Sequence, residues 1–434
     1  MKFVSTRNHN EKVSFTEALF RGLAPDGGLY RPENNPDLND FFLSLKKDAG
    51  FNEISSELTA KLLAPEISGE TAEKIVNDAF TFEPAIHELS PKLKILELFH
   101  GPSCAFKDFG ASFLASAMNN LLAGQGGKAI IVTATSGDTG SAVAQAFHGK
   151  ERIEVVILYP SGRVSPLQEK QLTTLGGNVT ALEVKGSFDD CQRMAKAAFT
   201  DPELSFLPLS SANSINLGRL IPQSFYYVWA WNKLRDSNFT FVVPSGNFGN
   251  ITAGLYAAAW GLPAKRFIAA TNANDVVPEY LKTGKYNPRA SVATYSNAMD
   301  VGAPSNFERL TDLYFNNVDT FRKNVIAYSV SDEATLETMK NTYKKYNYLC
   351  CPHTAVGINA AEQFLAENTK NETALVLSTA HPGKFVETVK KATGQSPQLP
   401  PQLALLLNKE KISVPIGNKN EDLRNWLLEN KTAD

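Results

Sequence analysis

The 434-residue chain has little cysteine, no cluster of basic residues and no long apolar run. Its four cysteines are too few for a disulfide framework, and they lack zinc-ligand spacing. The formal net charge of −2 argues against a nucleic-acid-binding surface. No apolar segment approaches the roughly 20 residues that cross a bilayer, and the first residues lack the apolar core of a signal peptide. We therefore expect a cytoplasmic protein without a metal site, a nucleic-acid partner or a membrane partner.

Hydrophobic residues make up 43% of the chain and charged residues 20%, which is ordinary for a globular protein. A chain of this length holds about two or three domains. From residue 94 onward, buried β-branched strands alternate with helices, and this alternation predicts an α/β fold with parallel sheets wrapped by helices. We expect a mixed, mostly helical N-terminal domain at 1–92, acting as scaffold or lid, and two lobes at 93–240 and 241–434. Residues 213–234 are expected to form one long helix.

One lysine stands in an unusual setting. Lys107 follows Phe106 and precedes Asp108 and Phe109. A lysine held in such a pocket loses solvation, which favours its neutral amine and makes it a nucleophile. Alternatively, the lysine stem packs against the aromatic rings while the ammonium group reaches water. This stretch by itself leaves both interpretations open.

Buried strands run into turns of small residues that open helices in TATSGDTGSA, in VPSGNFGNITAG and, less clearly, in LSTAHPGKF. A helix N-terminus attracts a phosphate or carboxylate, and glycine lets the ligand approach the backbone. Ordinary loops between strands and helices also favour these residues, but two such turns beside the lysine favour a ligand site. Neither turn matches GxGxxG, and the chain has no complete Walker loop. A phosphate turn, a nucleophilic lysine and no metal site together suggest pyridoxal phosphate.

Several motifs resemble, in order, those of the threonine synthase family, within the fold-type-II, tryptophan synthase β-like pyridoxal enzymes. They cover roughly residues 13–385 and include HGPSCAFKDFG, TATSGDTGSAVA, LYPSGRVSPLQEKQ, SANSINLGR, VPSGNFGNITAG, TNANDVVP, SNAMDV and STAHPGKF. The resemblance implies two open parallel-sheet lobes and conversion of O-phospho-L-homoserine and water into L-threonine and phosphate. Lys107 matches the Schiff-base lysine, which also carries protons. Thr379 falls where the family places a hydroxyl against the pyridine nitrogen.

The resemblance also implies three sets of binding residues. The turn that cradles the cofactor phosphate corresponds to Gly246, Asn247, Phe248, Gly249 and Asn250. The loop that holds the substrate carboxylate corresponds to Ser136, Gly137, Asp138 and Thr139. The site for the substrate phosphate corresponds to Asn213, Ser214, Asn216 and Arg219. For Asn213 and Asn216, capping of a helix start is an equally good interpretation.

Other functions remain open at this stage. A threonine dehydratase or a cysteine synthase would share Lys107 and the glycine turns, although Arg219 favours a phosphorylated substrate because its planar fork pairs with phosphate oxygens. A relative that has lost catalysis and only binds phosphorylated ligands is a further alternative, and the retained Lys107 and Thr379 argue against it. The family includes both monomers and homodimers, and the sequence favours neither state. No segment reads as an effector-binding insert.

Overall fold

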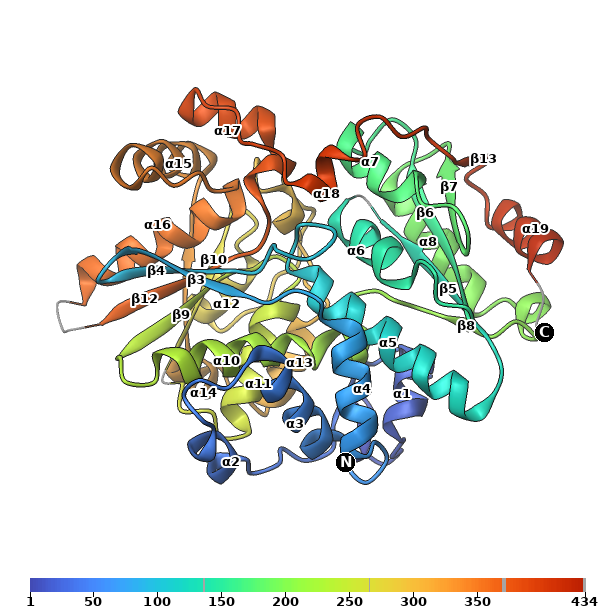
Figure 1. The fold of residues 1–434 in the computed structure, drawn as a ribbon, viewed down its shortest axis with the longest axis horizontal. Coiled ribbons are helices and arrows are strands. Elements are labelled where there is room, and N and C mark those ends of the chain that lie inside the picture. Colours follow the sequence, from blue (N-terminus) through green and yellow to red (C-terminus); the bar gives the residue numbers. More distant parts are fainter. Residues whose placement is uncertain (136, 265, 369–371, 432–434) are drawn as a thin grey trace.

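The computed structural model describes residues 1–135, 137–264, 266–368 and 372–431 (Figure 1). Its strands form a two-stranded sheet and two larger sheets, one with the order β11-β10-β9-β12-β4-β3 and one with the order β13-β7-β6-β5-β8. Pairing in the two larger sheets is parallel except between β3 and β4. The predicted α/β fold with parallel sheets is confirmed.

The six-stranded sheet draws its strands from separate parts of the chain. They are β3 (Ala85–Ser90), β4 (Leu93–Glu97), β9 (Phe239–Pro244), β10 (Phe267–Thr271), β11 (Val325–Ser329) and β12 (Thr373–Ser378). The helices of this part are α9 (Leu217–Leu220), α10 (Gln223–Leu234), α11 (Gly249–Ala259), α12 (Val276–Thr283), η2 (Asn297–Met299), α13 (Phe307–Leu313), α14 (Val318–Asn324), α15 (Asp332–Tyr346), α16 (Pro352–Glu367), η3 (Pro382–Lys384) and α17 (Val386–Thr393).

The five-stranded sheet is formed by β5 (Ala129–Ala134), β6 (Ile153–Pro160), β7 (Val179–Val184), β8 (Leu209–Ser210) and β13 (Val414–Ile416). Its helices are α5 (Lys107–Gln125), α6 (Asp138–Phe147), α7 (Pro166–Thr173), α8 (Phe188–Phe199), η1 (Pro202–Leu204), α18 (Pro401–Ala404) and α19 (Asn420–Asn430). Strand β5 is buried at every position, as expected for a parallel strand covered by helices on both faces.

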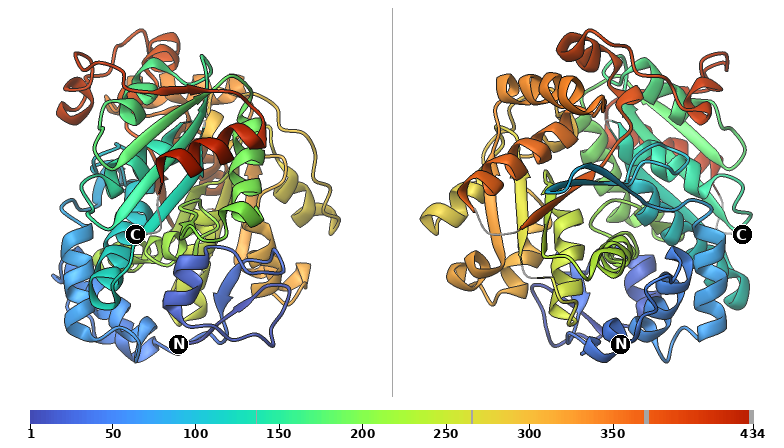
Figure 2. Two further views of the ribbon diagram at one scale, coloured as in Figure 1. Left: turned by 90° about the vertical axis from the view of Figure 1, so that its right-hand side faces the viewer. Right: turned by 60° about the vertical axis from the view of Figure 1, so that its left-hand side comes forward.

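Two segments cross between the predicted lobes. Strand β4 follows residue 92 but pairs with β12 in the six-stranded sheet, and β13, near the C-terminus, pairs with β7 in the five-stranded sheet. In Figures 1 and 2 the red C-terminal end accordingly lies against the sheet that contains β5, β6 and β7. The division at 1–92, 93–240 and 241–434 stays a prediction, but neither lobe is one continuous stretch of chain.

The expected long helix at 213–234 is wrong. The chain forms α9 and α10 instead, with Pro222 immediately before the second helix. Proline has no N–H to donate within a helix, and its ring clashes with the preceding turn.

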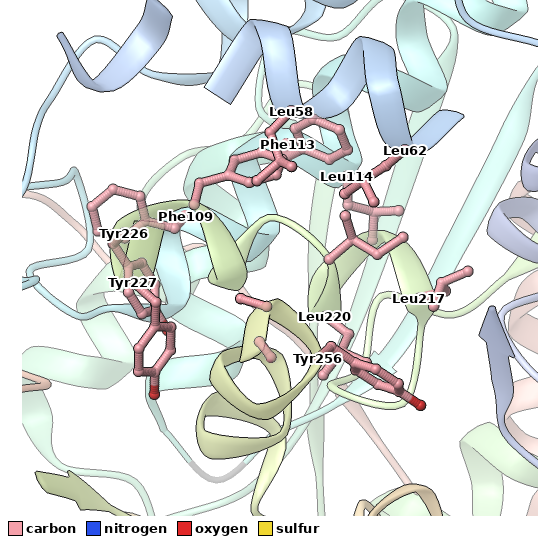
Figure 3. Close-up of a cluster of buried hydrophobic side chains, with 14 of the residues drawn as sticks. Leu58, Leu62, Phe109, Phe113, Leu114, Leu217, Leu220, Tyr226, Tyr227 and Tyr256 are labelled. Carbon is pink, nitrogen blue, oxygen red and sulfur yellow. The ribbon is translucent and has the colours of Figure 1, made fainter. Parts of the chain in front are cut away.

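The N-terminal domain packs on α5 and α10. It consists of β1 (Phe3–Ser5), α1 (Phe15–Arg21), β2 (Tyr30–Pro32), α2 (Asn39–Ser44), α3 (Phe51–Leu63) and α4 (Gly69–Ala79). Figure 3 shows Leu58 and Leu62 of α3 beside Phe113 and Leu114 of α5, and all four belong to one buried cluster. Because it shares this core with the lobes, the domain fits the scaffold role better than that of a lid.

Arg309 of α13 joins the N-terminal domain to the rest of the chain. It is fully buried and donates to the carbonyl oxygens of Tyr30 and Ile215 and to Asn306 Oδ1, at 2.6–3.0 Å. Asn306 in turn donates to the backbone oxygen of Asn247 at 3.2 Å. One arginine therefore ties the domain to the glycine turn after β9.

We expect Arg309→Met to destabilise the protein by about 3 kcal/mol, because it leaves buried carbonyl oxygens without donors. Arg7→Met is the matched control, since Arg7 also links the N-terminal domain to α13 but its side chain is 54% exposed. Its loss is expected to cost at most about 1 kcal/mol. Urea unfolding measures both variants, and equal losses would contradict the role given to Arg309.

Within the ranges that the structure describes, no helix is both long enough and apolar enough to cross a membrane.

Candidate active site

Lys107 is the first residue of α5 and is largely sheltered from solvent. Its side chain is 18% exposed, and its Nζ lies 3.9 Å from Asp138 Oδ2. Burial lowers the pKa of the Lys107 amine, and the nearby carboxylate of Asp138 only partly opposes this shift. Of the two interpretations that the flanking aromatic residues left open, the structure supports the sheltered lysine, and burial shifts its equilibrium toward the neutral amine. Its catalytic role stays a prediction.

Asp138 opens α6 and faces two lysines. Its Oδ1 accepts from Lys384 Nζ at 2.7 Å and from Gln168 Nε2 at 3.1 Å. Burial by itself would raise the pKa of Asp138, but the positive charges of Lys384 and Lys107 hold it well below its usual range. Asp138 is therefore an ionised carboxylate in a nearly solvent-free site.

The rest of the SGDTG loop is held by Thr135. Its Oγ1 accepts from the N–H groups of Gly137 at 3.0 Å and Gly140 at 2.9 Å. Thr139 is half-buried. Ser136, predicted to bind substrate, lies outside the described residues. The loop places the N-terminus of α6 beside Lys107, where backbone N–H groups favour an anion.

The SGNFGN turn connects β9 to α11. Phe248 adopts the left-handed conformation, with φ of 59°, directly before Gly249 begins the helix. Asn247 donates to Ser214 Oγ at 2.7 Å and accepts from the N–H of Ser305 at 2.6 Å. These contacts fix the turn against two other segments, and its role as a phosphate cradle stays a prediction.

Gly246 admits no side chain. A Cβ atom there would lie 2.5 Å from the Cα of Met299, a backbone atom that cannot rotate away. We expect Gly246→Ala to displace the turn and weaken binding of a phosphate ligand at least tenfold. Gly69→Ala is the control, because a Cβ atom there meets nothing within 4 Å and the residue lies in α4, outside this turn. Equal affinities in the two variants, measured by fluorescence titration, would contradict this prediction.

Asn250 carries an unpartnered group into the same turn. Its Oδ1 accepts from the hydroxyls of Tyr226 and Tyr227, both at 2.7 Å. Its Nδ2 is buried, and none of the described residues accepts a hydrogen bond from it. A buried donor without an acceptor is costly, so this group favours a ligand that supplies one.

Arg219 is a buried cation that forms no ion pair with any described carboxylate, although Asp108 lies near enough to act on its charge. The side chain is 2% exposed, its Nη1 donates to the Ala212 carbonyl at 2.6 Å, and its Nε has no acceptor among the described residues. Burial lowers the pKa of Arg219 to about 10, so it stays protonated near neutral pH. It packs against α5, because a Cβ at Gly110 would lie 2.7 Å from the Arg219 carbonyl oxygen. An unpaired buried charge favours an anionic ligand.

Asn216 and Asn213, also in NSINLGR, differ in how many of their side-chain amide atoms form hydrogen bonds with the protein. Asn216 caps α9, accepting from the Gly218 N–H at 2.9 Å, and its Nδ2 donates to the carbonyl oxygens of Leu19 and Ser211. Its whole amide is engaged, which supports the capping interpretation. Asn213 Oδ1 accepts from Thr133 Oγ1 at 2.7 Å and leaves its Nδ2 without a protein contact that the structure records.

Thr379 follows β12 and is 6% exposed. Its carbonyl oxygen accepts from the Phe106 N–H at 2.9 Å, and Ala105 pairs with Ala380 as an isolated β-bridge. These contacts bring the end of β12 to the loop that carries Lys107. The predicted residues on α5, α6, β12 and the SGNFGN turn thus come from four segments at the carboxyl ends of the strands, where α/β sheets bind ligands.

Comparison with known proteins agrees with this arrangement. Residues 86–380 match the family "Pyridoxal-phosphate dependent enzyme", residues 2–80 match "Threonine synthase N terminus", and residues 354–426 match "Threonine synthase, C-terminal". A threonine synthase from Haemophilus influenzae is 44% identical over 434 residues, covering 99% of this chain and all of that protein. The chain belongs to the threonine synthase family. The predicted family, fold class, cofactor and enzyme class are therefore confirmed.

Solved structures of threonine synthases share the whole fold. The threonine synthase with bound pyridoxal phosphate from Brucella melitensis superposes with a TM-score of 0.93 at 35% identity, covering 99% of each chain. The Escherichia coli threonine synthase gives 0.90 at 41% identity, covering 99% of this chain and all of that one.

The residues of this chain fit the cofactor of the family. Lys107 is a sheltered amine, and the SGNFGN turn precedes the N-terminus of α11, which suits a phosphate. Asn250 Nδ2 is a buried donor that has no acceptor among the described residues. Thr379 offers a hydroxyl beside the lysine loop.

Sequence reasoning missed two buried groups. Lys384, in the AHPGKF motif, pairs with Asp138, and His353 of α16 accepts from the Ala298 N–H at 3.2 Å. Burial lowers the pKa of His353 to about 4, so the ring is neutral near neutral pH. The motif containing Lys384 was visible in the sequence, but nothing local distinguished this lysine from a surface residue.

The structure also accounts for the SNAMDV segment. Asn272 Nδ2 donates to Asp300 Oδ1 at 2.9 Å and to Thr294 Oγ1 at 2.8 Å. These bonds hold the segment against the end of β10, which places Met299 over Gly246 and Ala298 beside His353. The TNANDVVP and SNAMDV motifs therefore act together to support the glycine turn.

Proposed function

We propose that this chain converts O-phospho-L-homoserine and water into L-threonine and phosphate, using pyridoxal phosphate bound at Lys107. The observation that carries the choice of substrate is Arg219, a buried cation beside α5 that no described carboxylate pairs with. A dehydratase acting on an unphosphorylated amino acid would have no use for this charge. The phosphate of O-phospho-L-homoserine provides the missing anion.

Three groups of residues hold the cofactor in this proposal. The N–H groups of residues 246–250 bind its phosphate, Thr379 meets its ring nitrogen, and Lys107 binds its aldehyde carbon. When bound, pyridoxal phosphate supplies an electron sink that stabilises negative charge on the carbon skeleton of the substrate. A hydroxyl at position 379 is a weak proton donor, which leaves more of that charge near the substrate and suits elimination.

The side chains of this chain bind the substrate and move its protons. The N–H groups of Asp138 and Thr139 bind the carboxylate, since the Gly137 N–H is already engaged by Thr135 and the Asp138 side chain by Lys384 and Gln168. The Lys107 amine takes one proton from Cα and one from Cβ, which allows phosphate to leave Cγ, and it returns protons to Cγ and Cα. Arg219 stabilises the phosphate as it leaves. Water then adds at Cβ.

The experiment is an assay of purified protein with pyridoxal phosphate and O-phospho-L-homoserine in which both products are counted. Equal amounts of phosphate and threonine support the proposal. Phosphate together with a keto acid would indicate elimination without hydration, as in a dehydratase. A coloured, cofactor-loaded protein that does not consume this substrate would indicate another amino acid.

The same proposal includes a cytoplasmic location and a monomeric or homodimeric state with a small-molecule substrate. Light scattering after size-exclusion chromatography distinguishes 47.4 kDa from twice that mass.

A further inference from the structure

Two lysines share one aspartate in the candidate site. The Lys384 side chain has no exposed surface, and its Nζ lies 2.7 Å from Asp138 Oδ1. Lys107 approaches the other oxygen of the same carboxylate at 3.9 Å. Lys384 follows β12 of the six-stranded sheet, whereas Asp138 opens a helix of the five-stranded sheet. The pair therefore joins the two lobes next to the reactive amine.

Lys384 is fixed in this position by a second bond. Its Nζ also donates to the Ser103 carbonyl at 2.8 Å, four residues before Lys107. Gln171 Nε2 donates to the same carbonyl at 3.1 Å. The lysine thus has a defined geometry, with one bond to the loop that carries Lys107 and one to the carboxylate beside it.

A buried carboxylate requires a cation, because an unpaired charge in such a site is costly. Among the described residues, only Lys384 and Lys107 lie within ion-pair distance of Asp138. Its remaining contact, Gln168, is neutral. Without Lys384, Asp138 would draw its positive charge from Lys107 and hold that amine in the ammonium form.

We propose that Lys384 is a positioning residue that occupies Asp138 and so leaves the Lys107 amine free to attach the cofactor. The proposal rests on the proposed role of Lys107. Attachment joins the Lys107 nitrogen to the aldehyde carbon; the nitrogen gives up its protons, and the aldehyde oxygen leaves as one water. Only the neutral amine can begin this step.

Six titratable or charged groups interact with the Lys107 amine, with its Asp138 partner or with Lys384. They are Asp138 on α6, Lys384 on η3, Arg219 on α9, His353 on α16, and Asp108 and Cys104 on or next to α5. Burial keeps two of them uncharged near neutral pH, because it lowers the pKa of His353 to about 4 and raises the pKa of Cys104 to about 12. Burial also raises the pKa of Asp108 to about 6, and its carboxylate accepts from the Ser103 N–H at 2.9 Å.

Because Lys384 and Asp138 carry opposite charges, removing one or the other should shift the pKa of the Lys107 amine in opposite directions. Lys384→Met removes a repelling cation and leaves Asp138 to Lys107 alone, so the pKa of the amine rises. Asp138→Asn removes the attracting anion and keeps the Lys384 charge, so the pKa falls. The double variant removes both charges and returns the pKa toward that of the native protein.

The experiment measures the rate of cofactor attachment to cofactor-free protein against pH, from the visible absorbance that appears on mixing with pyridoxal phosphate. We expect Lys384→Met to shift the midpoint of the profile upward by at least one pH unit, which slows attachment at neutral pH about tenfold. Asp138→Asn shifts the midpoint downward, and the double variant lies between the two. Lys390→Met, an exposed lysine on α17, is the control and keeps the native profile.

A merely structural role for Lys384 would slow attachment equally at every pH and would not be corrected by Asp138→Asn. Shifts in the same direction, or no shift, overturn the proposal. If Lys384→Met does not fold, the comparison between Asp138→Asn and the double variant decides, because only the single variant keeps the Lys384 charge; equal midpoints then overturn the proposal. If the native protein itself attaches no cofactor, the proposed function fails as well.

Discussion

Replacing Lys107 with alanine is expected to reduce threonine formation by at least about 10⁴-fold. The change removes both the group that binds the cofactor and the base that moves the proton at Cα, and general acid–base catalysis by itself contributes up to about 10⁴. The visible band of the loaded protein should disappear as well. Release of threonine and of phosphate from O-phospho-L-homoserine, followed together, measures the loss.

Lys107→Arg is the matched control for this prediction. Arginine keeps a positive charge near Asp138 and preserves the buried ion-pair network, but its pKa is too high for a neutral nucleophile at physiological pH. We therefore expect this variant to fold and to be as inactive as the alanine variant. Activity above about one hundredth of the native rate in either variant would rule out the role given to Lys107.

The parts of this site that could be predicted are those encoded locally. The aromatic neighbours of Lys107 left its setting open between a sheltered amine and one that reaches water, and the structure, with the side chain 18% exposed, decides for the first. The glycines after β9 predicted a turn that a ligand can approach, which stays a prediction, and the structure adds that Gly246 faces the Met299 backbone. Buried strands and glycine turns depend on a few consecutive residues, so they can be recognised from the local sequence.

Groups that depend on distant contacts could not be predicted. Lys384 donates to the carbonyl of Ser103, which lies 281 residues away in the chain. Arg309 reaches the Tyr30 carbonyl across 279 residues. No local sequence pattern distinguishes Lys384 or Arg309 from a solvent-exposed side chain, because their partners come close only when the chain is folded. The crossing of β4 and β13 between the sheets was hidden for the same reason.

Asn216 is a residue for which the sequence left two roles open and the structure favours one of them. From the sequence, binding of the substrate phosphate and capping of a helix were equally good interpretations. The structure engages its amide with the backbone of Leu19, Ser211 and Gly218. Within NSINLGR, the group best placed to recognise an anion is therefore Arg219, whose Nε remains unpaired.

Arg219→Met is expected to lower kcat/KM for O-phospho-L-homoserine by about 10³-fold, because loss of a buried, charge-assisted contact costs roughly 2–5 kcal/mol. Competitive inhibition by inorganic phosphate should weaken in parallel, whereas attachment of pyridoxal phosphate at Lys107 should be retained. Arg219→Lys keeps the charge but loses the planar fork, so an intermediate loss is expected. Unchanged inhibition by phosphate in the methionine variant would contradict this assignment.

Stability should separate Arg219 from the other fully buried arginine. Arg309 donates to Tyr30, Ile215 and Asn306, so its removal leaves several acceptors unsatisfied. Among the described residues, the Arg219 side chain donates to the Ala212 carbonyl alone, and its charge is offset only by the nearby Asp108, with which it forms no ion pair. Replacement of Arg219 by methionine is therefore expected to leave the free energy of unfolding of the ligand-free protein unchanged or higher. If Arg219→Met lowers activity without lowering the free energy of unfolding, Arg219 serves ligand binding and not the stability of the fold. Urea unfolding of Arg219→Met and Arg309→Met tests this distinction.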